Sequence, residues 1–232
     1  MLARAGVPVR RTGSEVRVTC VDELELDEVT VPGDLSSAAF LIAAALIVPS
    51  SRVTVRDVGV NWTRTGFLRV LERMGASIGG TLEPAGTVAD DEPVTDLEVE
   101  ASALTGTVVG AGEVPLAIDE LPLVALLGCF AEGVTEVQGA GELRLKESDR
   151  IATVVDGLRG LGADIEATED GFVVEGTGGL AGGRIESHGD HRLAMLGAVA
   201  GLASREGVEV GDMAAASVSY PSFAEDLARL AR

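Results

Sequence analysis

The chain has 232 residues, of which 46% are hydrophobic and 24% are charged, a composition that excludes a disordered protein. The formal net charge of −19 and the 3% aromatic content argue against nucleic-acid binding, which needs cations for phosphates and aromatic rings for base stacking. Two cysteines, Cys20 and Cys129, make neither a CxxC pair nor a disulfide framework, so we expect reduced thiols in a cytoplasmic protein.

No targeting or membrane segment is expected from the sequence. The most apolar run, residues 38–48, is much shorter than the roughly 20 residues needed to cross a bilayer, and we interpret it as a buried helix. The two histidines, His188 and His191, are too few for an ordinary zinc site. We therefore expect neither a metal nor another cofactor.

In chain order, residues 1–30 precede any repeated pattern and resemble the end of another domain, with strand-like segments at 16–18 and 29–31. A first unit then begins at Asp34, which precedes an apolar helix at 35–48. A strand at 53–55 and an amphipathic helix at 66–76, with Gly75 as its C-terminal cap, follow. Residues 79–96 are rich in turn residues and predict a loop or irregular hairpin before a strand at 97–100.

The same order of elements recurs twice. In the second unit, Asp119 precedes a helix at 121–133, a strand at 135–137 and a helix that ends near Gly162. Strands at 172–175 and 184–186 come before the third unit, which repeats the pattern from Asp190 to the helix at 223–231. Three copies of one α/β unit are therefore predicted, and their first, very apolar helices should share one buried core.

The helix starts have an ordinary structural interpretation and a functional one. Asp34, Asp119 and Asp190, and either Ser148 or Asp149, are each placed to act as helix N-caps. If the three apolar helices point the same way, however, their N-terminal ends could together face an anion. Spacing alone does not decide between these interpretations.

Two charged clusters lie at such helix starts. The segment 144–150, RLKESDR, contains Lys146, the single lysine of the chain. The segment 188–192, HGDHR, begins the third unit. On charge pattern alone, the first cluster could equally be a solvated helix start.

The motifs VPGDLSSAAF, IDELPLVALL, ELRLKESDRI, HGDHRLAM and SYPSF resemble, in order and spacing, the C-terminal half of the 5-enolpyruvylshikimate-3-phosphate synthase family. The resemblance covers essentially the whole chain. It implies one domain of an inside-out α/β barrel, made of three βαβαββ units with buried helices. Residues 1–30 would be the remnant of the preceding domain and the crossover from it. Residues 31–232 would be the C-terminal domain, with units at about 31–110, 111–183 and 184–232.

The family resemblance also implies an activity. Such enzymes transfer the enolpyruvyl group of phosphoenolpyruvate (PEP) to the 5-hydroxyl of shikimate 3-phosphate and release phosphate, in the biosynthesis of aromatic amino acids. The partners would be these two small molecules and the N-terminal domain that this chain lacks, with no nucleic acid and no membrane. We expect the isolated chain to be inactive, because it supplies one wall of the site.

The resemblance assigns acid and base groups to this sequence. Asp119 matches an aspartate that contacts the substrate hydroxyls and is the candidate base. Glu147 matches the glutamate beside the PEP methylene, and Lys146 matches a lysine near the reacting hydroxyl and phosphate.

The remaining matches are groups that bind PEP. Arg150 and Arg192 match two arginines whose planar guanidinium groups suit carboxylate and phosphate. His191 would donate to PEP or orient Glu147, whereas Asp190 is interpreted as its structural partner and N-cap.

The sequence departs from the family pattern in three places. Many members carry a lysine just before the motif that is Tyr220-Pro221 here, and this chain has none. Glu142 stands where many relatives have a substrate-binding asparagine, so we leave it out of the expected site. Ser36-Ser37 resembles a substrate-binding pair of the absent domain, but we interpret it as helix capping.

Two alternative functions remain open at this stage. The chain could be a stand-alone, non-catalytic half-domain that acts as a scaffold or binding unit. It could also belong to the UDP-N-acetylglucosamine enolpyruvyl transferases, although these lack the paired KESDR and GDHR motifs.

Overall fold

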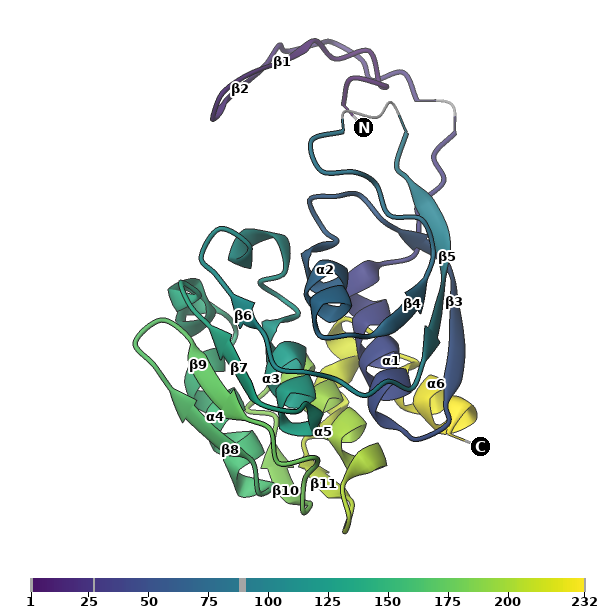
Figure 1. Ribbon diagram of the computed structural model, residues 1–232. Helices are drawn as coiled ribbons and strands as arrows, with labels where there is room; N and C mark the ends of the chain where they lie inside the picture. Colours follow the sequence, from purple (N-terminus) through teal and green to yellow (C-terminus); the bar gives the residue numbers. More distant parts are fainter. Residues whose placement is uncertain (1, 27, 88–90, 232) are drawn as a thin grey trace.

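The structure is a computed structural model that describes residues 2–26, 28–87 and 91–231. It contains the three predicted α/β units, arranged around a centre of helices with the strands outside them (Figure 1). The inside-out arrangement expected from the sequence is therefore confirmed.

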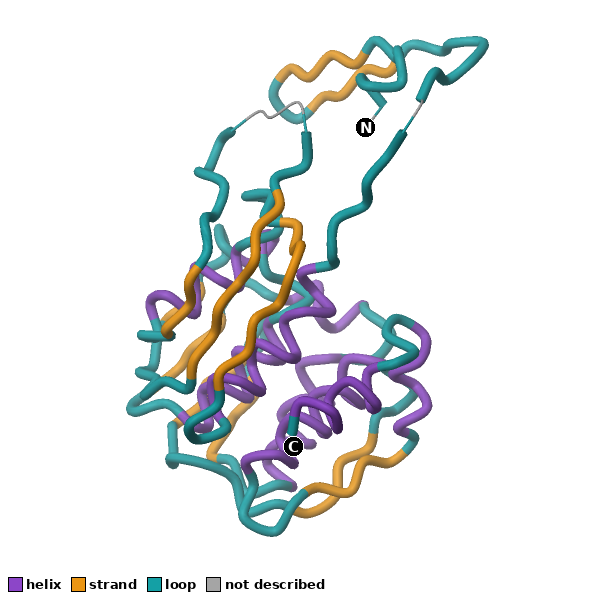
Figure 2. Tube along the Cα trace, turned by 90° about the vertical axis from the view of Figure 1, so that its right-hand side faces the viewer, coloured by secondary structure: helices purple, strands orange, loops and turns teal. Residues whose placement is uncertain are grey.

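The N-terminal region forms a hairpin that stands away from the rest of the chain (Figure 2). Its strands β1 (Val9–Thr12) and β2 (Glu15–Val18) pair antiparallel and are exposed along their whole length. The strand expected at residues 29–31 is absent from the structure. Val29 and Val31 are both exposed, Val31 by 78%, so this segment has no buried face that would favour pairing with a sheet.

The first unit packs a long helix against an antiparallel sheet of order β3-β5-β4. Gly75, with φ of 86°, follows its second helix as predicted. The expected loop is shorter than residues 79–96, because a strand already begins at Val94; residues 88–90 of that loop lie outside the described residues. The elements are α1 (Leu35–Ile47), β3 (Arg52–Gly59), α2 (Gly66–Arg73), β4 (Ser77–Gly79) and β5 (Val94–Glu100).

The second unit has a four-stranded sheet of order β6-β7-β9-β8, in which only β6 and β7 are parallel. β6 belongs to this sheet although it lies just before the expected boundary near residue 110. Gly162, with φ of 96°, ends the second helix as predicted. The elements are β6 (Val108–Val109), the 3-10 helix η1 (Val114–Leu116), α3 (Leu121–Phe130), β7 (Val134–Val137), the 3-10 helix η2 (Gly141–Leu145), α4 (Arg150–Gly160), β8 (Asp164–Ala167) and β9 (Phe172–Glu175).

The third unit has two parallel strands, β10 and β11, and ends in a helix that packs on the first unit. The rings of Phe40 and Phe223 meet edge to face with centroids 6.0 Å apart. The elements are β10 (Gly183–Glu186), α5 (His191–Ala203), β11 (Val208–Gly211), the 3-10 helix η3 (Met213–Val218) and α6 (Phe223–Leu230).

All three units share one pairing. The segment before the first helix of each unit runs parallel to the strand after that helix: Gly33 beside Val58, β6 beside β7, and β10 beside β11. In the first unit this strand is reduced to the single bridge at Gly33, which explains why a longer strand around residues 29–31 does not form. The predicted internal repeat is thus visible in the hydrogen bonding.

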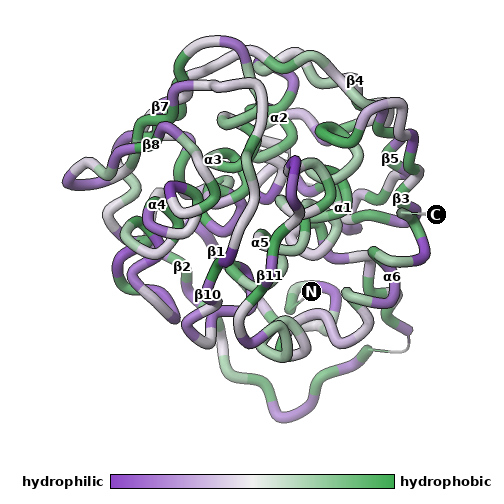
Figure 3. Tube along the Cα trace, turned by 90° about the horizontal axis from the view of Figure 1, so that it is seen from below, coloured by the Kyte–Doolittle hydropathy of each residue, from purple (hydrophilic) through white to green (hydrophobic). Residues whose placement is uncertain are grey.

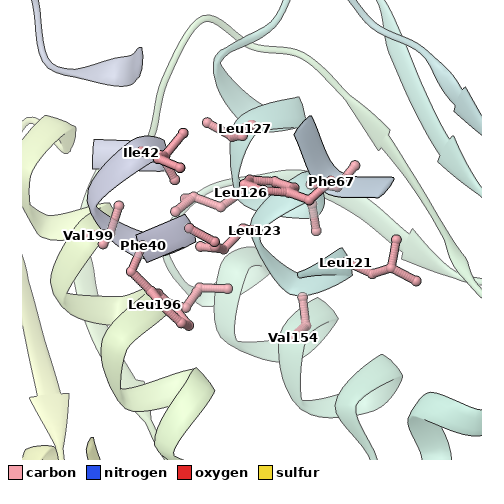
Figure 4. Close-up of a cluster of buried hydrophobic side chains, with 14 of the residues drawn as sticks. Phe40, Ile42, Phe67, Leu121, Leu123, Leu126, Leu127, Val154, Leu196 and Val199 are labelled. Carbon is pink, nitrogen blue, oxygen red and sulfur yellow. The ribbon is translucent and has the colours of Figure 1, made fainter. Parts of the chain in front are cut away.

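The core is formed by α1, α3 and α5, each of which contacts the other two. Because these helices are apolar on all sides, they are stable only when buried on all sides. Phe40, Leu126 and Leu196 are among the buried residues where the helices meet (Figure 4). Seen from below, the hydrophobic segments gather at this centre (Figure 3). No helix in the described part of the chain is long and apolar enough to cross a membrane.

Candidate active site

The N-terminal ends of the three core helices lie side by side. Ser36 Oγ, in the first turn of α1, donates a hydrogen bond of 2.5 Å to Oε1 of Glu120, the residue before α3. Arg192 Nη1, in the first turn of α5, donates to the backbone oxygen of Asp119 at 3.1 Å. The partial positive charge of three helix N-terminal ends therefore converges at one end of the core, so the condition that the sequence left open, a common direction of the three helices, is met.

Three of the expected N-caps are confirmed. Asp34 accepts from the backbone N–H of Ser37 at 2.9 Å, Asp149 from that of Ala152 at 3.1 Å, and Asp190 from that of Arg192 at 2.9 Å. These bonds satisfy N–H groups that a helix leaves free in its first turn.

Asp119 is not a helix cap, and that interpretation of the sequence is wrong. The cap position of α3 is Glu120, which makes no side-chain capping bond. Pro122 stands at the second position of the helix and has no N–H to offer to a cap. The Asp119 side chain is consequently left available for the site.

The Asp119 carboxylate lies among three cations. Its Oδ1 is 3.3 Å from Arg150 Nη1 and 3.5 Å from Lys146 Nζ, and its Oδ2 is 3.6 Å from Arg192 Nη2. Burial alone would raise the pKa of Asp119, but the charges of Arg192, Lys146 and Arg150 outweigh it and hold the pKa below its ordinary value. Asp119 is therefore an ionised, partly exposed base with cations on several sides.

Arg150 is almost fully buried, with 1% of its surface exposed. Its Nε donates to Asp190 Oδ2 at 2.8 Å, its Nη2 donates to Glu147 Oε2 at 2.5 Å, and its Nη1 to Asp119. Asp190 is fully buried, and although burial opposes ionisation, the hydrogen bond and charge of Arg150 keep its pKa low. The guanidinium is thus bonded to three carboxylates, and a ligand that replaced one of them would take over an N–H donor already in place.

Glu147 and His191 border the site on its open side. The Glu147 side chain is 50% exposed, and its Oε1 is 4.0 Å from His191 Nδ1. Burial, with help from the nearby charge of Arg192, lowers the pKa of His191 despite the opposing charges of Asp190 and Glu147. The imidazole is therefore neutral near pH 7 and able to donate from one nitrogen and accept at the other.

Among the neighbouring polar residues, Glu142 lies at the rim of the site, whereas Arg144 and Ser148 bond to residues that hold the site in place. The exposed Glu142 carboxylate is 3.7 Å from Lys146 Nζ, so it reaches the rim although the sequence analysis left it out. Arg144 turns away and pairs with Asp149 at 2.8 Å, which supports the loop before α4. Ser148 donates to Asp190 at 3.0 Å.

Sequence reasoning missed three polar residues at the same helix ends. Ser36 was interpreted as helix capping, but its hydroxyl bonds to Glu120 and also accepts from Arg64 Nη2 at 2.7 Å. Ser37 is not the cap of α1 either: Asp34 is the cap, and Ser37 Oγ donates to its carboxylate at 2.7 Å, so the capping interpretation of this serine pair is wrong. A glutamate placed directly before an entirely apolar helix was the available signal for Glu120.

All six expected site residues are thus brought together: Asp119, Lys146, Glu147, Arg150, His191 and Arg192. Within residues 2–26, 28–87 and 91–231, no group of three or more His, Cys, Asp or Glu side chains is arranged to hold a metal ion. The arrangement offers one ionised base, one exposed carboxyl group and several cations around a common point.

Comparison with known proteins places this arrangement in a family. The chain matches the family model described as EPSP synthase (3-phosphoshikimate 1-carboxyvinyltransferase) over residues 1–227. It is 44% identical over 232 residues to the 3-phosphoshikimate 1-carboxyvinyltransferase of Bacillus cereus strain ATCC 10987, covering 100% of this chain and 53% of the relative. It is 48% identical over 229 residues to that of Desulforudis audaxviator, covering 98% and 52%.

Solved structures agree with these relatives. An EPSP synthase from Acinetobacter baumannii superimposes with a TM-score of 0.89 and 39% identity, covering 99% of this chain and 53% of that one. The enolpyruvyl transferase NikO from Streptomyces tendae has a TM-score of 0.73 at 20% identity, with 99% and 51% coverage, and so shows the fold alone. This chain spans about half the length of the curated relatives that it matches. With the motifs, the three-unit fold and the matched relatives in agreement, the chain belongs to the EPSP synthase family.

Proposed function

We propose that this chain is half of an enzyme that transfers the enolpyruvyl group of PEP to the 5-hydroxyl of shikimate 3-phosphate, releasing phosphate, in aromatic amino-acid biosynthesis. The observation that carries the proposal is the position of Asp119. An ionised carboxylate 3.3–3.6 Å from three cations puts a proton acceptor and the positive charges that two anionic substrates need at one point.

In the addition step, the 5-hydroxyl oxygen attacks C2 of PEP and its proton passes to Asp119. At the same time, the methylene carbon C3 takes a proton from Glu147, which must bind that proton as its ion pair with Arg150 gives way to PEP and which is left as a carboxylate. Lys146, beside Asp119, stabilises negative charge on the attacking oxygen. A tetrahedral intermediate results, with a methyl group at C3 and both oxygens bonded to C2.

In the elimination step, Glu147 takes a proton back from the methyl group and the bond from C2 to the phosphate oxygen breaks. The electron pair of the C–H bond forms the new double bond, and the leaving phosphate receives the proton that Asp119 had accepted. Both side chains then return to their starting protonation states. The half-exposed position of Glu147 supports this role, because it leaves room for the methylene group.

Arg192, His191 and Arg150 are the proposed contacts to PEP. Arg192 contacts Asp119 with Nη1 on the backbone oxygen and with Nη2 on Oδ2. Its other N–H donors remain for an anion. Arg150 is proposed to exchange its bond to Glu147 for a bond to PEP. That exchange would free Glu147 for proton transfer as PEP arrives.

We also propose a division of the chain and a partner. Residues 1–30 are assigned to the end of a preceding domain and its crossover, and residues 31–232 to the C-terminal domain, with units at about 31–110, 111–183 and 184–232. An N-terminal domain of the same enzyme is the proposed partner, and closure of the two domains would exclude water from the site. A cytoplasmic location is supported by two unpaired cysteines, Cys20 and Cys129, in the described residues.

The test is an assay of phosphate release from PEP and shikimate 3-phosphate. It is run with this chain, with a separately produced N-terminal half, and with the two mixed. We expect turnover only in the mixture, and its loss on Glu147→Gln but not on the control Asp156→Asn, an exposed carboxylate on α4. Turnover by the chain alone would overturn the need for a second wall. An inactive mixture whose halves bind each other would overturn the proposed function.

A further inference from the structure

A hydrogen-bonded series of three side chains links the first unit to the turn that carries Asp119, the proposed catalytic base. Arg64 Nη2, in the loop before α2, donates to Ser36 Oγ at 2.7 Å, and Ser36 Oγ donates to Glu120 Oε1 at 2.5 Å. Ser36 and Glu120 are buried, with 5% and 3% of their surface exposed, and are far apart in sequence. This Arg64–Ser36–Glu120 series takes no part in the proton transfers described above.

This hydrogen-bonded series ends at Glu120, the residue that follows Asp119 in the sequence. Glu120 is held toward α1, while the side chain of Asp119 faces Lys146, Arg150 and Arg192. The Asp119 backbone oxygen also accepts from Arg192. Glu120 is thus bonded to Ser36 of the first unit and Asp119 to Arg192 of the third, so the turn that contains them is tied to both units.

Helix α3 does not fix this turn by capping. Glu120 makes no capping bond and Pro122 has no N–H to be capped. The local bonds are backbone ones: the N–H groups of Glu120 and Leu121 donate to the Ala117 oxygen, and the Glu120 oxygen accepts from Leu123 and Val124. The other two core helices have aspartate caps that bond their own first turns. At α3, a contact from a different unit takes the place of a cap.

We propose that Glu120 is a positioning residue, which acts through Ser36 and Arg64 to hold the Asp119 carboxylate in its place among Lys146, Arg150 and Arg192. The inference rests on the proposed function only in treating Asp119 as the base. Burying a carboxylate is costly, and an apolar residue of similar size would often give equal or greater stability. A positional requirement accounts for an acid at this buried point, and the burial-raised pKa of Glu120 reflects that cost.

The first test measures Asp119 directly and does not depend on turnover. The 13Cγ signal of Asp119 is followed by NMR as this chain is titrated with acid. The Ser36→Ala variant changes no charge, but it removes the hydroxyl that connects Arg64 to Glu120. We expect the Asp119 pKa to rise toward its ordinary value of 3.8, because the carboxylate moves away from its three cations. Ser36→Cys, which keeps the size and donates only weakly, serves if the alanine variant does not fold.

The matched control is Ser51→Ala. Ser51 Oγ bonds to the backbone oxygen of Ala45 at 2.5 Å, so this change removes a hydroxyl bond from the opposite end of the same helix. We expect the Asp119 pKa to stay at its wild-type value there. Glu120→Gln keeps the acceptor for Ser36, and Glu120 is already protonated in the pH range where Asp119 titrates, so this variant should leave the Asp119 pKa unchanged, in contrast to Ser36→Ala. An unchanged Asp119 pKa in a folded Ser36→Ala or Ser36→Cys chain would overturn the proposal.

The second test uses the enzyme assembled with its N-terminal half. A misplaced base slows the chemical step, so Glu120→Ala and Ser36→Ala should lower kcat about tenfold or more and change the KM for PEP much less. Glu120→Gln keeps the acceptor and should retain more of kcat than Glu120→Ala does. A purely structural role would lower the yield of folded enzyme and leave kcat per active site intact, which would contradict the proposal. If the unmodified assembly is inactive, the proposed function fails and the Asp119 titration decides this inference alone.

Discussion

The two ends of the core helices α1, α3 and α5 differ sharply in chemistry. Their N-terminal ends hold the buried polar side chains Ser36, Glu120, Arg150 and Asp190. Their C-terminal ends are closed by backbone bonds from Val48, Ala131 and Ser204 and by the neutral hydroxyls of Ser51 and Ser204, with no charged residue in the last turn. One bundle of helices thus carries stability at one end and chemistry at the other.

The difference extends to the space beside each end. Near the C-terminal end of α1, a groove of about 180 Å³ lies against α5 and α6 and has an almost wholly apolar lining, apart from Ser51. At the other end, by contrast, the carboxylates and cations lie a few ångströms apart and satisfy one another. Changes at the N-terminal end should therefore alter function, whereas changes at the C-terminal end should alter the free energy of unfolding.

The largest effect is expected from Glu147→Gln at the N-terminal end. The amide keeps the shape of the side chain but cannot exchange a proton with the PEP methylene. We expect turnover of the assembled enzyme to fall by about 10²–10⁴, with a small change in PEP affinity. Steady-state kinetics test this, with Glu166→Gln on the exposed face of β8 as the control. Near wild-type turnover would remove Glu147 from the proton transfers.

A substitution at the C-terminal end of a core helix should lower the free energy of unfolding and leave turnover unchanged. Leu46, in the last turn of α1, is almost fully buried, and Leu46→Ala would leave a cavity. We expect the free energy of unfolding to fall by roughly 2–5 kcal/mol, while kcat per folded enzyme stays the same. Urea unfolding of the chain measures the first quantity, and active-site titration of the assembled enzyme the second. A drop in kcat larger than the loss of folded protein would break the division between the two ends.

Much of this division could be predicted from the sequence. The repeat and the apolar helices follow from hydrophobic pattern and from helix-start residues, and the structure confirms caps at Asp34, Asp149 and Asp190. Periodicity identifies such features because they depend on near neighbours in the chain.

What the sequence could not provide depends on contacts between units. Asp34, Asp119 and Asp190 occupy the same place in the repeat, yet Asp119 alone is not a cap, because Glu120 is tied to α1 and Pro122 lacks an N–H. The strand expected at residues 29–31 did not form: both of its valines are exposed, and pairing with β3 begins only at Gly33. In these cases the local sequence pattern matches that of the corresponding segments in the other units, and contacts between units decide whether the predicted cap or strand forms.

A smaller effect is expected from Arg192→Lys. Lysine keeps the positive charge but loses the planar pair of donors that suits a carboxylate or phosphate. We expect PEP binding in the presence of shikimate 3-phosphate to weaken by roughly 1–3 kcal/mol, measured by titration of the assembled enzyme. Arg229→Lys, at an exposed pair on α6, is the control. An unchanged affinity would mean that Arg192 serves Asp119 and does not bind PEP.

The smallest effect concerns pH and separates two buried acids at the same end of the core. Burial opposes ionisation of Asp190, but the hydrogen bond and charge of Arg150 hold its pKa below the ordinary 3.8. For Glu120, burial outweighs the bond from Ser36 and the charges of Arg192 and Arg64, so its pKa lies above the ordinary 4.5. The two acids therefore act on stability in different pH ranges and in opposite directions.

The sign follows from which state binds the proton more tightly. Asp190 binds it less tightly when folded, so its contribution to stability is complete above pH 3.8 and is lost as pH falls through its lower, folded pKa. Glu120 binds it more tightly when folded, so its contribution is complete below pH 4.5 and is lost as pH rises through its higher, folded pKa. Urea unfolding across this range should show that Asp190→Asn flattens the acid side of the stability curve and that Glu120→Gln flattens the side above pH 4.5. If both variants change the same side, Arg150 does not distinguish these acids, and the charge cluster at the N-terminal end titrates as one unit.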